Sequence, residues 1–175
     1  MKQLLALMVL IAGGIAAQQY TKEGELTLPD YRKWVFIGSG LGMSYLPQQA
    51  GENPPFTNVF AEPSAYDQFV ENGVWPDKAM LVAERRASVT NLSINKTGWA
   101  QTGEAHGAEL EVKDQSKGGW LFYEFRAGEK TAKSLPKTMV CYSCHEEHAA
   151  VDNTFVQFYP SLIETAKKHG TYKER

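Results

Sequence analysis

The segment Cys141-Tyr142-Ser143-Cys144-His145 constrains this chain more than any other feature, because it has the C-x-x-C-H spacing of a c-type haem attachment motif. In such a motif each cysteine sulfur bonds one vinyl group of the porphyrin. The histidine after the second cysteine supplies a nitrogen ligand to the iron. The chain has 2 cysteines and both lie in this motif. The sequence therefore predicts one covalently bound haem c, held by Cys141 and Cys144, with His145 as the metal ligand.

Two other interpretations of the cysteine pair are open. A dithiol redox motif has the same cysteine spacing, but such motifs belong to βαβ units and do not need the trailing histidine. A zinc site would have to combine Cys141, Cys144 and His148 with a distant fourth ligand, because structural zinc is four-coordinate. Covalent haem matches more of the motif than either alternative.

The first residues of the chain have the pattern of a secretory signal. A single positive charge at Lys2 is followed by an apolar run over residues 4–17, and Ala16 and Ala17 provide a small-residue cleavage site. The run is shorter than the ~20 residues of a membrane-spanning helix. We therefore expect a signal peptide over residues 1–17 and a single haem-binding domain over 18–175, located in the periplasm with no membrane span after cleavage.

The charge balance excludes one class of partner. Lys and Arg number 18 against 20 Asp and Glu, for a formal net charge of −2. A nucleic-acid-binding domain needs a strongly basic face. The chain is therefore not expected to bind nucleic acid.

Hydrophobic spacing predicts mainly strands in the middle of the chain and helices at its end. Residues 108–113 alternate apolar and polar side chains with period 2, which is typical of a strand with one buried face. Further strands are expected over residues 35–37, 57–61, 79–91 and 120–125. Helices are expected over 63–72, from Thr138 through the haem motif, and over 156–168. The predicted fold class is α+β, mainly antiparallel sheet, with the haem motif on a C-terminal helical segment.

The sixth coordination position of the iron has no obvious ligand. No methionine follows His145, and His148 lies three residues further on, on the same helix face, so it cannot reach the opposite side of a porphyrin. Upstream, Met43, Met80 and His106 remain alternatives. The sequence favours a five-coordinate iron whose open face binds small gases.

Several segments resemble the cytochrome P-460 family, which includes the cytochromes c′-beta. The segments are Tyr31-Arg32-Lys33-Trp34-Val35, Gly119-Trp120-Leu121-Phe122-Tyr123, and the stretch from Leu135-Pro136 through the haem motif to Phe155-Val156-Gln157-Phe158-Tyr159-Pro160. The resemblance implies a mostly antiparallel β domain with the haem held against a sheet, usually as a homodimer. In the family, P-460 proper oxidises hydroxylamine, using a lysine cross-linked to the porphyrin and a glutamate in the distal pocket.

This sequence departs from that pattern at both positions. Compared with the family, Ala83 takes the place of the cross-linking lysine and Val140 takes the place of the glutamate. Valine cannot accept a proton, so hydroxylamine oxidation is disfavoured, although whether the protein is an enzyme stays open and no catalytic residue is assigned.

The resemblance then points to cytochrome c′-beta, whose apolar pocket favours NO and CO over O₂. The residues expected to line the apolar distal pocket are Phe36, Phe60, Leu81, Ala83 and Val140, with Arg85 near a haem propionate or the distal rim. The alternatives are an electron-transfer cytochrome with a redox partner protein, or an oxidoreductase acting on hydroxylamine or NO.

Overall fold

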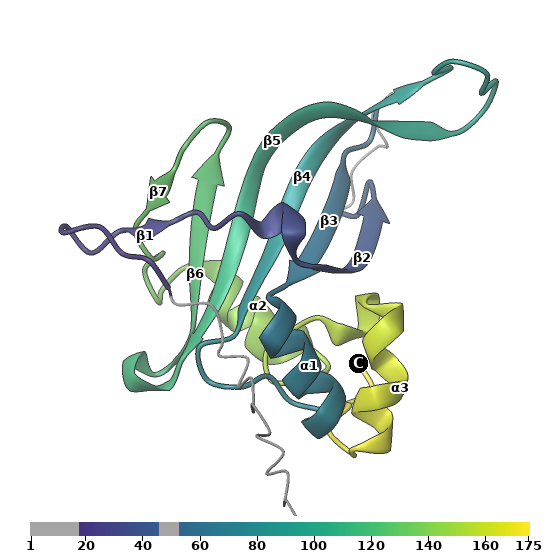
Figure 1. Ribbon diagram of the computed structural model, residues 1–175. Coiled ribbons are helices and arrows are strands. Elements are labelled where there is room, and N and C mark those ends of the chain that lie inside the picture. The colour runs from purple at the N-terminus through teal and green to yellow at the C-terminus, as the bar shows by residue number, and fades with distance from the viewer. Residues whose placement is uncertain (1–17, 46–52) are drawn as a thin grey trace, which may run out of the picture.

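The computed structural model describes residues 18–45 and 53–175, so the expected signal peptide lies outside the described residues. Its centre is a five-stranded antiparallel sheet in the order β2-β3-β4-β5-β6 (Figure 1). The strands are β2 (Val35–Leu41), β3 (Phe56–Ala61), β4 (Met80–Thr90), β5 (Trp99–Asp114) and β6 (Gly119–Arg126). Each strand pairs with its neighbour in the chain, which confirms the predicted α+β class with a mainly antiparallel sheet.

Three helices gather near one end of the sheet (Figure 1). They are α1 (Pro63–Asn72), α2 (Val140–His148) and α3 (Pro160–Lys168). The remaining elements are the short strands β1 (Leu26–Thr27) and β7 (Thr131–Ala132), which pair with each other, and the 3-10 turns η1 (Tyr31–Lys33), η2 (Gln115–Lys117) and η3 (Val156–Phe158). Within residues 18–45 and 53–175, no helix has the length and apolar character needed to span a bilayer.

Side chains on the two faces of the sheet enter two separate cores. Along β4, Leu81 packs into the core between the sheet and the helices, whereas Met80 and Val82 pack into the core on the opposite face, beneath β1 and η1. This split results from the alternation of side chains along a strand. We call the first the helix-side face of the sheet and the second the far face.

Helix α1 is bounded by signals that the sequence contains. The carboxylate of Glu62 accepts a hydrogen bond from Ala65 N at 2.8 Å, and Pro63 occupies the first turn, where its missing N–H removes no helical bond. Gly73 ends the helix with φ 73°, a left-handed conformation that glycine adopts without strain. The predicted span over residues 63–72 is confirmed.

The predicted helix over residues 156–168 is divided in two. Pro160 disfavours helical backbone at the residue before it, and Tyr159 accordingly has φ −113° and ψ 84° between η3 and α3. Hydrophobic spacing alone does not predict this interruption of the helix at Tyr159. The helix with the haem motif begins at Val140, so that Met139 rather than Thr138 occupies the cap position.

Candidate functional site

Helix α2 presents Cys141, Cys144 and His145 on one side, because residues three and four apart share a helix face. Both cysteines are free, are half-buried, and pack against the helix-side core. Burial raises the pKa of the Cys141 thiol above its ordinary value. The three side chains thus combine two available thiols and an imidazole on one helical turn.

The imidazole of His145 is held in one orientation. Its Nδ1 lies 2.8 Å from the carbonyl oxygen of Asn153, and since a carbonyl only accepts, Nδ1 carries the proton. The rings of Phe122 and Phe155 flank it, with centroids 4.5 and 4.4 Å away. Burial lowers the pKa of His145 below its ordinary value, so the ring is neutral at pH 7. Nε2 therefore has a free lone pair, which is the form in which histidine binds a metal.

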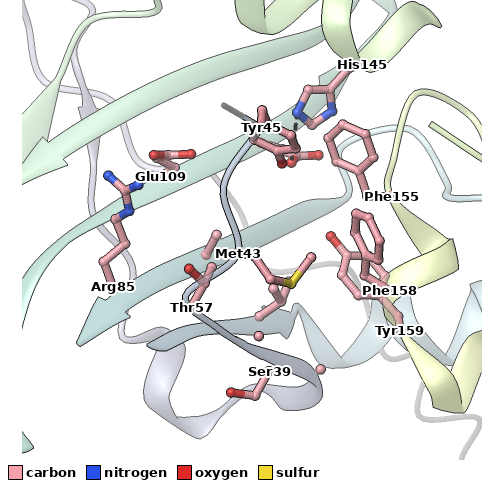
Figure 2. Close-up of a pocket in the computed structure, with 15 residues that line it drawn as sticks. Ser39, Met43, Tyr45, Thr57, Arg85, Glu109, His145, Phe155, Phe158 and Tyr159 are labelled. Carbon is pink, nitrogen blue, oxygen red and sulfur yellow. Dashed lines mark ion pairs between the residues drawn. The ribbon is translucent and has the colours of Figure 1, made fainter. Parts of the chain in front are cut away.

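A pocket lies between this histidine and the sheet. Figure 2 shows Arg85 and Glu109 on one side of it and Phe155, Phe158 and Tyr159 on the other. Its empty space is about 850 Å³ when the open mouth is included. A neighbouring pocket that includes Cys141 shares Glu109, Glu111 and His145 with it. The two hollows together extend from the cysteine-bearing helix face across β5.

Glu111 is an unusual group in this pocket. Its Oε1 lies 3.8 Å from His145 Nε2, while its Oε2 is buried with no hydrogen-bond partner among the described residues. Burial, with a smaller contribution from the charge of Glu109, raises the pKa of Glu111 to about 8. At pH 7 this pKa favours the protonated carboxyl group, and the contact with His145 is then one between neutral groups.

These residues fit a covalently bound haem. The site offers two free thiols, a neutral imidazole with Nε2 facing the hollow, aromatic walls, and a buried carboxyl oxygen that no described protein group satisfies. Buried polar atoms without partners are rare in folded proteins, and a bound group is one reason for them. Cys141 and Cys144 would hold the porphyrin and His145 would bind its iron.

The residues expected to form the distal pocket are not all brought together. Ala83 and Arg85 line the pocket with His145. Leu81 is on the same sheet face but packs into the helix-side core without lining the pocket. The other three, Phe36, Phe60 and Val140, lie elsewhere.

Phe36 and Phe60 are separated from the pocket by the sheet. Phe60 packs against the far-face core, with its ring centroid 5.7 Å from that of Tyr31. Phe36 contacts Phe60 at the same centroid separation and is 55% exposed. Even and odd positions along a strand point to opposite faces, so Val59 lines the pocket and Phe60 cannot.

Val140 lies outside the pocket, so the expectation that it leaves the pocket without a proton acceptor is wrong. It is the first residue of α2, is 73% exposed, and does not line the pocket. The pocket instead contains Glu109 and Glu111 from β5, so its lining is not apolar and does include carboxyl groups. The sequence carries the signal for both, since they share one face of the alternating segment 108–113, but nothing in the spacing connects that face to the haem motif.

The candidate sixth ligands are also separated by the fold. Met43 lines the pocket that contains His145. Met80 is 2% exposed in the far-face core, on the other side of the sheet. His106 is exposed and does not line the pocket. Of these three candidates, Met43 alone shares the pocket with His145.

A family model described as cytochrome P460 matches residues 28–156, which include the whole sheet and the Cys141–His145 segment. No curated protein matches the chain.

Proposed function

Because the chain belongs to the cytochrome P460 family, we propose that it is an exported, periplasmic mono-haem c-type cytochrome that binds NO or CO at a five-coordinate iron. The observation that carries this proposal is geometric: the imidazole of His145, oriented by the Asn153 carbonyl, faces a pocket beside two free cysteines on the same helix face. The signal-like pattern of residues 1–17 supports export, and c-type haem is attached outside the cytoplasm.

The described residues divide the work in this site. Cys141 and Cys144 would anchor the cofactor, and His145 would bind the iron from the α2 side. Bound haem would supply an iron that takes up a small ligand. Arg85, an exposed cation at the pocket, is placed to pair with an anionic group such as a haem propionate.

The choice of NO and CO rests on access to the iron. Of the three candidate sixth ligands, Met43 alone lines the pocket with His145, and its side chain is half exposed. The lining includes hydrogen-bond donors at Arg85 and Tyr45. Because these side chains could donate a hydrogen bond to bound O₂, we do not propose that the pocket excludes O₂.

A second candidate function is oxidation of hydroxylamine or NO. It is favoured by Glu109 and Glu111, because carboxyl groups beside a reacting centre can accept or donate protons. It is disfavoured by Ala83, since among the described residues no lysine lines the pocket to form the family's porphyrin cross-link.

The optical spectrum of the purified ferrous protein tests the proposal. We expect a high-spin spectrum that changes on adding NO or CO without prior displacement of an internal ligand. Ala83→Leu should weaken CO binding about tenfold. Once haem occupies the pocket, the larger side chain would overpack it, which costs roughly 1–3 kcal/mol. Phe60→Ala, on the far face, should leave CO binding unchanged. A low-spin ferrous spectrum that becomes high-spin in Met43→Leu would instead indicate an electron-transfer cytochrome.

Covalent attachment is tested by mass. Protein made with a haem-maturation system should exceed the cleaved polypeptide by one haem, through thioether bonds at Cys141 and Cys144 alone. The double variant Cys141→Ser, Cys144→Ser should lose this added mass. A tryptic haem peptide with a third attachment point would contradict the proposal and favour the hydroxylamine-oxidising candidate.

A further inference from the structure

The carbonyl group that orients His145 belongs to a tight turn between α2 and η3. Val151 and Thr154 form an antiparallel bridge, with Thr154 N donating to Val151 O at 2.7 Å. The two residues between them, Asp152 and Asn153, have φ of 47° and 58°. Two successive left-handed residues are the signature of a type I′ turn, and Asp and Asn are the side chains that tolerate this conformation best after glycine.

Two side chains from distant segments hold this turn. Lys113, on β5, places its Nζ 2.6 Å from Asp152 Oδ2 and 2.7 Å from the carbonyl oxygen of Trp75. The indole Nε1 of Trp75 in turn donates to Thr154 Oγ1 at 2.8 Å. The Lys113 side chain is 13% exposed and that of Asp152 28%, so this ion pair is largely shielded from water.

The held turn is directly connected to the imidazole. Asn153, which accepts the proton of His145 Nδ1 at 2.8 Å, lies between Asp152 and Thr154, the two residues that are anchored. The geometry of this hydrogen bond therefore depends on where the anchors place the turn. A hydrogen bond at the second ring nitrogen fixes the orientation of a ligating histidine and raises its basicity.

We propose that Lys113 and Asp152 are positioning residues that set how strongly His145 binds the haem iron. This inference rests on the proposed haem function of the site. The ion pair acts through the Asn153 carbonyl and touches neither the pocket nor the imidazole. Loosening the turn lengthens the Nδ1–H···O bond and makes His145 a weaker ligand.

A purely structural role for the ion pair would have a different signature. Such a role would lower the melting temperature without altering the iron–histidine bond. The chain offers a control ion pair next to Lys113 in the sequence: Asp114, the last residue of β5, pairs with Lys78. Neither residue has a hydrogen bond or ion pair with His145 or its turn, so Lys78→Met removes a Lys–Asp ion pair, with a more exposed lysine, without disturbing the Asn153 carbonyl.

The test uses the haem-loaded protein and its variants Lys113→Met, Asp152→Asn and Lys78→Met. Asparagine keeps the turn conformation accessible while removing the charge. Resonance Raman spectroscopy of the ferrous form reports the iron–histidine stretching frequency, which we expect to fall in the first two variants and to stay at the parent value in Lys78→Met. With NO as the probe, displacement of His145 should be about tenfold more favourable in the first two variants.

Haem content, measured first as the pyridine haemochrome, separates failure of this inference from failure of the proposed function. A parent protein without covalent haem would refute the function and this inference with it. Fully loaded Lys113→Met and Asp152→Asn variants with an unchanged stretching frequency would refute the positioning role alone. Equal frequency shifts in all three variants would also refute it, because the control does not contact the turn.

Discussion

Replacing His145 with alanine is expected to abolish the native haem spectrum, whereas His148→Ala leaves it unchanged. The side chain of His145 is 13% exposed and its Nε2 faces the pocket. His148 is 65% exposed, and its Nε2 lies 3.5 Å from Glu147 Oε2 at the surface. Of these two imidazoles, only that of His145 has the orientation and the shielded surroundings of an iron ligand.

The measurement is the ferrous and ferric absorption spectrum of each variant at equal haem content. Haem should remain attached in His145→Ala, because the thioether bonds to Cys141 and Cys144 do not depend on the imidazole. Added imidazole, which is small enough to enter the space left by the ring, should restore part of the parent spectrum. Loss of the native spectrum in His148→Ala, with His145→Ala unaffected, would contradict the assignment.

The sequence predicted the parts of this protein that depend on local spacing. The C-x-x-C-H motif identifies three candidate side chains that share one helix face, since their separation of three and four residues is the repeat of a helix. The strands were predictable for a similar reason, because alternation over residues 108–113 requires one buried face. Gly73 marked the end of α1 because few other residues adopt its backbone angles without strain.

The lining of the pocket depends on long-range strand register, which spacing within one segment does not contain. Phe60 pairs with Val82 on the far face, whereas Val59 pairs with Ala83 on the helix-side face. The pocket is therefore lined by Val59 and Ala83, which are smaller than their sequence neighbours Phe60 and Val82. Glu109 and Glu111 reach the pocket because β5 runs antiparallel beside β4, with Glu109 opposite Ala83. Apolar character alone therefore predicts Phe60 in the pocket, where it does not lie, and misses Glu109 and Glu111, which do line it.

Replacing Glu84 with glutamine is expected to lower the free energy of unfolding by about 3 kcal/mol at pH 7, the scale of removing one partner from a buried ion pair. Glu84 is 1% exposed on the far face of the sheet. Its Oε1 accepts from Tyr31 Oη at 2.6 Å and from Arg32 at 2.5 Å, and its Oε2 accepts from Arg86 Nε at 2.5 Å. Glutamine cannot accept all of these bonds, and it removes the charge that both arginines face.

The same cluster predicts how the loss varies with pH. Burial alone would raise the pKa of Glu84, but hydrogen bonds from Tyr31 and Arg86, with the charges of Arg32 and Arg86, hold it below its ordinary value. A carboxyl group with a lowered folded-state pKa stabilises the fold above its unfolded pKa, and this contribution is lost as the pH falls through the folded value. The difference between the parent and Glu84→Gln should therefore be full at pH 7 and shrink below about pH 4.5.

Urea unfolding of the parent and Glu84→Gln at a series of pH values measures this difference. Tyr31→Phe is the matched control, because it removes one of the hydrogen bonds to Glu84 and keeps the carboxylate and both arginines. It should lower the free energy of unfolding by about 1.5–2 kcal/mol, the lower part of the range for a hydrogen bond to a charged group, and with a weaker dependence on pH. A Glu84→Gln effect that stays constant from pH 7 to pH 3 would show that the loss comes from packing rather than from the charge. Glu84 lies across the sheet from His145, so the haem spectrum of the folded variant should match that of the parent.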